Sequence, residues 1–159
     1  MTVDELNASP DAEALFLRCC GSRRWARAMT AARPFAALAA VLDTADRIWN
    51  ALTPIDWREA FAAHPKIGER TRDVWAAGEQ AGASSASAAV RERLAAANRA
   101  YEARFGYIFI VCAAGKSADA MLALAEERLQ HDSERELHVA AEEQRNITRL
   151  RLSKLLASA

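Results

Sequence analysis

His64 is the residue of this chain whose type and position best suit proton transfer. It stands directly before Pro65, at the end of an amphipathic helical pattern, and Gly68 follows shortly after. Proline lacks an amide donor and pushes the preceding residue into an extended conformation. Histidine changes charge nearest to neutral pH. The pattern therefore predicts a titratable ring at a helix exit, on a stiffened loop. On these residues alone, it also fits a plain loop histidine without a chemical role.

The other two histidines lie in polar surroundings. His131 is in a polar turn, and His138 is in a charged helical stretch between Glu136 and Glu142. We expect both side chains at the surface, without a role in a reaction.

Glu79 and Gln80 place an acid and an amide side by side among small residues, and Gly82 follows. Glutamate can orient a histidine or share a proton with it, and glutamine can bind a polar ligand. Glycine allows a ligand to approach the backbone closely. These residues predict a partner for a catalytic histidine, although a solvated helix end has the same composition.

Two arginines of the last helical stretch differ in their position around the helix. At about 100° per residue, Arg151 falls between Leu150 and Leu155 within the apolar arc, whereas Arg149 lies toward its margin. An arginine on a buried face needs an anionic partner. A carboxylate of a substrate and a structural ion pair within the protein both meet that need.

Capping residues and helical periodicity predict that these residues are positioned by an all-α fold, a single-domain helical bundle. Residues 66–87 are expected to form a loop with one short helix around 75–81. Two capping boxes are expected, Thr2 with Glu5 and Ser133 with Glu136. The predicted helices are an opening one after Thr2, one from Ser9-Pro10 to Gly21, one around 25–32, one within 34–52, one from Thr53-Pro54 to His64, one from Ser85 or Ser87 to Gly106, one from Ser117 to Gln130, and one from Ser133 to about Leu156.

Residues 107–112 form a continuous apolar run rich in β-branched and aromatic side chains. Such a run is typical of a buried strand. Because no other stretch is a credible strand partner, we expect an isolated extended segment inside a helical protein.

Composition limits the classes of protein further. The 159 residues suit one domain, 52% are hydrophobic, and the formal net charge is zero, with a pI near 6.8. Bulk charge therefore does not indicate a nucleic-acid partner. No apolar run of about 18 residues predicts a membrane span, and no signal-peptide core is evident, so a cytoplasmic protein is expected. Cys19, Cys20 and Cys112 match neither a disulfide framework nor a zinc site and are expected to be small buried residues.

Several motifs in order resemble the 2-oxo-4-hydroxy-4-carboxy-5-ureidoimidazoline (OHCU) decarboxylase family. Each motif is weak alone, but the ordered set covers nearly the whole chain and is highly specific. The matching motifs are His64-Pro65-Lys66-Ile67-Gly68, Glu79-Gln80-Ala81-Gly82, Asn98 through Tyr101 to Arg104-Phe105-Gly106, Phe109-Ile110-Val111-Cys112-Ala113, Gly115-Lys116, Arg128-Leu129, Glu136-Leu137 and 147–152.

The resemblance implies an all-helical, homodimeric enzyme of urate degradation. It implies conversion of OHCU into (S)-allantoin and carbon dioxide without a metal or an organic cofactor. It assigns catalysis to His64 and Glu79. It gives Gln80 as a substrate-binding amide, and the backbone at Ile110 and Val111 is expected to meet the ligand. Pro65, Gly82 and Arg151 are the other expected substrate-binding positions.

One position departs from the family pattern. Many members have a serine three residues before the glutamate, where this chain has Ala76. Ser84 or Ser85 would have to supply a hydroxyl contact if the substrate needs one. Two other functions stay open, namely a non-catalytic helical module that binds a small metabolite or a partner helix, and a cofactor-free enzyme acting on a related ureido compound.

Overall fold

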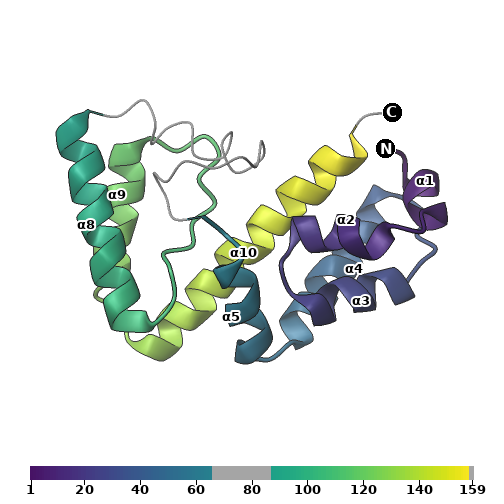
Figure 1. The fold of residues 1–159 in the computed structure, drawn as a ribbon, viewed down its shortest axis with the longest axis horizontal. Coiled ribbons are helices and arrows are strands. Elements are labelled where there is room, and N and C mark those ends of the chain that lie inside the picture. The colour runs from purple at the N-terminus through teal and green to yellow at the C-terminus, as the bar shows by residue number, and fades with distance from the viewer. Residues whose placement is uncertain (66–86, 158–159) are drawn as a thin grey trace. The chain divides into compact units, whose positions relative to one another are not determined.

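The computed structural model describes residues 1–65 and 87–157, and all regular secondary structure in these residues is helical (Figure 1). The all-α fold class is therefore confirmed. The short helix predicted around 75–81 lies outside the described residues. The helices are α1 (Val3–Ala8), α2 (Ala12–Cys19), α3 (Arg23–Ala31), α4 (Leu38–Ala51), α5 (Pro54–Ala62), α8 (Ala88–Phe105), α9 (Ala118–Arg128) and α10 (Ser133–Leu156).

The chain divides into two compact units. The first joins Met1–Ala60 to Gln144–Ala159, and the second is Phe61–Glu143. Helices α5 and α10 each contribute residues to both units. That residues 1–159 form one domain stays a prediction. In the described part of the chain, no helix has the length and apolarity needed to cross a bilayer.

The first unit is built on α2, α3 and α4, of which α3 packs against the other two. Its core holds Trp25, whose ring meets Phe16 edge-on at 5.9 Å between centroids. The indole nitrogen of Trp25 donates to the carbonyl of Ala45 at 3.2 Å. The polar edge of the largest core side chain is thus satisfied, as burial requires.

The second unit pairs α8 with α9, which lie side by side (Figure 1). The apolar 107–112 segment follows α8 and has no strand partner within residues 1–65 and 87–157, as predicted. Aromatic packing holds it instead. Tyr101 of α8 meets Phe109 at 5.3 Å and Phe105 at 4.7 Å. The strand-like composition of this segment therefore reflects burial of large rings in an aromatic cluster.

Most helix ends follow the predicted capping signals. Thr2 and Glu5 form the reciprocal capping box, Ser87 and Ser117 cap α8 and α9, and Gly106 ends α8 with φ 83°. Only glycine adopts this left-handed conformation without steric cost.

Two predicted caps are wrong. Ser9 accepts a hydrogen bond from the Asp11 amide at 3.1 Å, which places Pro10 in a turn, so α2 begins only at Ala12. At α10 the side chain of Asp132 accepts from the Arg135 amide at 2.8 Å, one residue before the predicted cap.

Candidate active site

His64 lies just beyond the end of α5, as the sequence predicts. The helix ends at Ala62, and the His64 amide donates to the carbonyl of Phe61 at 3.2 Å in a final turn. The residue is half-buried, and Pro65 follows it. A ring at a helix exit with partial access to solvent suits a group that exchanges protons with a ligand. Its catalytic role stays a prediction.

Two aromatic rings join the α5 exit to the apolar 107–112 segment. Phe61 and Tyr107 are buried, with ring centroids 5.2 Å apart. His64 comes three residues after Phe61, and Ile110 comes three residues after Tyr107. Both belong to the second unit. The ring contact therefore anchors two predicted site segments, about 50 residues apart in sequence, on one hydrophobic cluster.

Cationic side chains hold the backbone of the 107–112 segment by its carbonyl groups. Arg128 Nη1 donates to the carbonyl of Ile110 at 2.6 Å, and Lys116 Nζ donates to the carbonyl of Cys112 at 2.8 Å. Ile110 and Val111 are themselves buried. Within residues 1–65 and 87–157, the Val111 amide makes no hydrogen bond. The segment is thus fixed through carbonyls, while one amide keeps its donor capacity.

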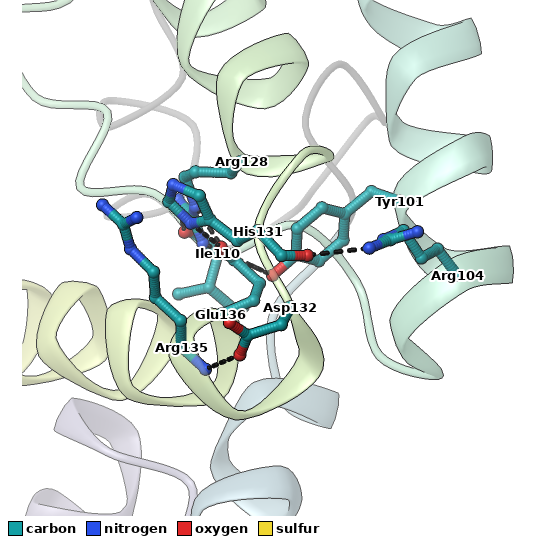
Figure 2. A network of polar contacts seen from close by, with 8 residues as sticks. All are labelled: Tyr101, Arg104, Ile110, Arg128, His131, Asp132, Arg135 and Glu136. Atoms are coloured by element: carbon teal, nitrogen blue, oxygen red, sulfur yellow. Dashed lines mark hydrogen bonds and ion pairs between the residues drawn. The ribbon is translucent and has the colours of Figure 1, made fainter.

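Arg128 belongs to a buried polar network in which Glu136 is the central acceptor (Figure 2). Glu136 is 0% exposed, and its Oε1 accepts from Arg128 Nε at 2.6 Å and from the Tyr101 hydroxyl at 2.7 Å. Its Oε2 lies 3.0 Å from His131 Nδ1. The carboxylate is therefore surrounded by donors from three parts of the second unit, which offsets the cost of burying its charge.

The electrostatics of the network keep Tyr101 as a donor. Burial raises the pKa of the Tyr101 phenol, and Arg128 opposes this only in part. The neutral hydroxyl donates to Glu136 and receives a long contact from Arg128 Nη2 at 3.4 Å. The Arg128 guanidinium also lies 4.5 Å from the centre of the Phe109 ring, a cation–π distance.

The prediction of a surface His131 is wrong, because Glu136 draws its ring into this network and leaves the side chain 11% exposed. Its carbonyl accepts from Arg104 at 2.8 Å. The predicted capping role of Glu136 is also wrong, because its carboxylate binds Arg128, Tyr101 and His131. The usable signal in the sequence was a pair of opposite charges, Arg128 and Glu136, on either side of the short turn between α9 and α10.

Arg149 and Arg151 of α10 lie in the first unit. They differ in burial as their positions around the helix predict. Arg151 is 7% exposed, and its Nη1 meets the carbonyl of Arg18 at 3.4 Å. Arg149 forms the ion pair, with its Nη1 2.5 Å from Asp46, which Arg145 also contacts at 3.2 Å. The buried-side placement of Arg151 is confirmed. Its contact with a substrate stays a prediction.

The remaining predicted site residues are not described. Glu79, Gln80 and Gly82 lie outside the described residues, as do Ala76, Ser84 and Ser85. Tyr101 and Phe105, which belong to the matching motifs, are buried in the second unit.

A hollow of about 620 Å³ lies beside the start of α10 and contains none of the predicted site residues. Four of its seven lining side chains are carboxylates, against one arginine, so it would repel a ligand that carries a carboxylate. It is therefore not the candidate site. It is lined by Asp132, Glu134, Arg135, His138, Val139, Glu142 and Glu143.

Cys19 and Cys20 are buried, as expected, and burial raises the pKa of each thiol to about 12. Cys112 is only half-buried, in contrast to the expectation. Over residues 1–65 and 87–157, no three His, Cys, Asp or Glu side chains gather as metal ligands would.

Comparison with known proteins decides the family. The sequence model described as OHCU decarboxylase matches residues 7–153. The chain belongs to the OHCU decarboxylase family. The match includes every residue predicted for the site, from His64 to Arg151. The family resemblance drawn from the ordered motifs is thereby confirmed.

Two relatives match this chain over only part of their own length. It is 37% identical over 150 residues to the uric acid degradation bifunctional protein TTL of Arabidopsis thaliana, covering 87% of this chain and 45% of that protein. It is 34% identical over 103 residues to the 2-oxo-4-hydroxy-4-carboxy-5-ureidoimidazoline decarboxylase of Haloferax volcanii, covering 63% of this chain and 61% of that protein. The match thus spans less than half of the first relative and about three fifths of the second.

Two solved structures share the fold. An OHCU decarboxylase crystallised in the presence of (S)-allantoin is 36% identical, with a TM-score of 0.82 over 90% of this chain and 97% of that chain. An (S)-allantoin synthase is 23% identical, with a TM-score of 0.73 over 97% of this chain and 54% of that chain. The second likeness concerns the fold alone.

Proposed function

We propose that this protein decarboxylates OHCU to (S)-allantoin and carbon dioxide without a cofactor, as a carboxy-lyase of urate degradation. The observation that carries the proposal is the family match over residues 7–153, which includes every predicted site residue. The relative crystallised with (S)-allantoin supports the same reaction.

The reaction needs a group that accepts the electron pair of the breaking C–C bond. OHCU supplies it in its own conjugated imidazoline ring, so the pair moves into the ring as carbon dioxide leaves. In the proposed mechanism, His64 removes the proton of the substrate hydroxyl group, and Glu79 orients His64 or shares its proton. A proton is then delivered to the ring carbon that bears the ureido group, and delivery to one face gives the S product.

Different residues are proposed to bind the neutral polar groups and the negative charge of the substrate. Gln80 and the backbone at Gly82, Ile110 and Val111 are proposed to hold the ureido group and the polar atoms of the ring. Arg151 is proposed to balance the negative charge of the substrate. Pro65 is proposed to shape the loop that carries the histidine and to line the site.

The chirality of the product tests this function most directly. OHCU is generated fresh from urate with urate oxidase and hydroxyisourate hydrolase, and circular dichroism follows allantoin with and without this protein. We expect fast accumulation of the S enantiomer only with the protein, because an unassisted intermediate can be protonated on either face. Formation of allantoin at the unassisted rate and without chirality would favour a non-catalytic binding module, and turnover of a different ureido compound alone would favour the related enzyme.

The oligomeric state and the cellular location of this protein are also proposed. We propose a homodimer, the assembly that the family resemblance implies, and a cytoplasmic location. No nucleic-acid or membrane partner is proposed.

A further inference from the structure

We propose that the buried network of Arg128, Glu136 and Tyr101 is a positioning device for the substrate-binding backbone at Ile110 and Val111. The inference rests on the proposed function, because that function makes this backbone a ligand contact. It adds residues that touch no substrate and act through the peptide they hold.

The hydrogen bond from Arg128 sets the direction of the peptide plane between Ile110 and Val111. Arg128 Nη1 donates to the Ile110 carbonyl at 2.6 Å, so this carbonyl points toward the network. The peptide between Ile110 and Val111 is trans. In a planar trans peptide, the carbonyl and the following amide point in opposite directions. Arg128 therefore turns the Val111 amide away from the network.

The Val111 amide is buried and is available as a hydrogen-bond donor among the described residues. Val111 is 4% exposed, and its amide makes no hydrogen bond within the described residues. More than about 90% of buried backbone amides in proteins are paired. An amide without a partner among the described residues, at a position whose backbone is proposed to meet the ligand, is suited to donate to a polar atom of the substrate.

The hydrogen bond to Glu136 holds the Arg128 guanidinium in place (Figure 2). Its Nε is held by Glu136 at 2.6 Å, and Glu136 is held in turn by the Tyr101 hydroxyl at 2.7 Å. The guanidinium is planar, so fixing Nε also fixes the direction of Nη1. Arg128 is 3% exposed, which excludes competing water. The network thus transmits a fixed geometry from α8, α9 and α10 to one peptide.

The decisive variant is Arg128→Lys. Lysine keeps the charge beside Glu136, but its single nitrogen cannot reproduce the fork that binds Glu136 and Ile110 together. We expect KM for OHCU and Kd for (S)-allantoin, measured by calorimetry, to rise about tenfold, with a smaller change in kcat, because a contact made in both ground and transition states is weakened.

Two further variants separate positioning from plain stability. Tyr101→Phe removes one donor to the Glu136 carboxylate and keeps the ring, so we expect KM to rise only about threefold, because Arg128 still holds Glu136 and Ile110. Met121→Ala, at a buried apolar site on the same helix α9, is the matched control. It should lower the melting temperature and leave KM unchanged.

These experiments separate the positioning role of the network from the proposed function. A folded Arg128→Lys protein with wild-type KM and Kd overturns the positioning role while the proposed function stands. If that variant does not fold, a wild-type KM in Tyr101→Phe overturns it. A rise in KM of equal size in Met121→Ala overturns it as well. An unmodified protein without activity toward OHCU overturns the proposed function, and this inference with it.

Discussion

The rings of Phe61 and Tyr107 pack together with 5.2 Å between their centroids and 47° between their planes. This contact joins the end of α5, where His64 follows, to the apolar 107–112 segment. Both rings lie in the second unit, and Tyr107 also meets Tyr101 at 5.9 Å. The aromatic cluster and the buried network around Glu136 therefore share Tyr101.

Replacing Phe61 with leucine should loosen this contact and lower activity as well as stability. We expect a loss of about 1–3 kcal/mol in the free energy of unfolding. We also expect kcat/KM to fall about tenfold, because small displacements of reacting groups are costly. Urea unfolding and the OHCU assay measure the two effects. Phe16→Leu, at an equally buried site in the first unit, is the control and should reduce stability alone. Equal losses of activity in both variants would contradict the assigned contact.

His64→Asn should lower kcat by about 10²–10⁴-fold, the usual contribution of general acid–base catalysis. The variant should keep the helical circular dichroism spectrum, because His64 lies beyond the last helical residue of α5. His138→Asn, on α10, serves as the control and should retain normal turnover. Near-normal turnover of fresh OHCU by His64→Asn would show that the catalytic assignment is wrong.

Gly106→Ala should destabilise the protein by about 1–2 kcal/mol, because a side chain disfavours the left-handed backbone. The cause is conformational strain, since a Cβ atom at Gly106 would meet nothing within 4 Å. Gly106→Asn should lose less, because asparagine tolerates this conformation better. Urea midpoints of the two variants test this order, and an alanine variant as stable as the wild type would refute the strain.

Asp132→Ala should cost about 1 kcal/mol, the usual value of an N-cap side chain. Ser133→Ala should change the free energy of unfolding by less than about 0.5 kcal/mol, as for other surface positions. The Asp132 side chain accepts from the Arg135 amide at 2.8 Å, and Ser133 is already the first residue of α10. Thermal melts of both variants give the comparison. A larger loss in Ser133→Ala would restore the capping box predicted from sequence.

The stability of the protein should fall as pH rises from about 9 toward 12. Burial raises the pKa of Cys19 and Cys20 to about 12 from an ordinary value of 9.0. Above pH 9 the unfolded thiols lose protons that the folded thiols retain, which favours unfolding by at most about 1.4 kcal/mol per pH unit for each thiol. Below pH 9 this contribution to stability is fully present.

A double variant, Cys19→Ala with Cys20→Ala, isolates this effect. It should be less stable at pH 7, because it leaves space in the core, yet its free energy of unfolding should decline less steeply with pH. Urea unfolding at pH 7, 9 and 10.5 measures the slopes. Parallel slopes for the variant and the wild type would rule out the buried thiols as the source.

The sequence by itself determined the features that depend on neighbours within a few residues. Ser87 and Ser117 begin helices, Gly106 ends one, and Pro65 follows the α5 exit, because caps and prolines act within one helical turn. The burial of Arg151 followed from its angle around α10. The ordered motifs also identified the family, although the roles of Glu79 and Gln80 stay predictions.

The tertiary structure alone decided which of several possible partners a polar side chain takes. Glu136 is three residues after Ser133 and suited a capping box, yet it binds Arg128 and Tyr101. Tyr101 precedes it by 35 residues in sequence, on α8 rather than α10, and only the tertiary fold brings the two together. A buried carboxylate must find donors, and this demand outweighs a solvent-exposed local hydrogen bond, because leaving the charge without them costs more.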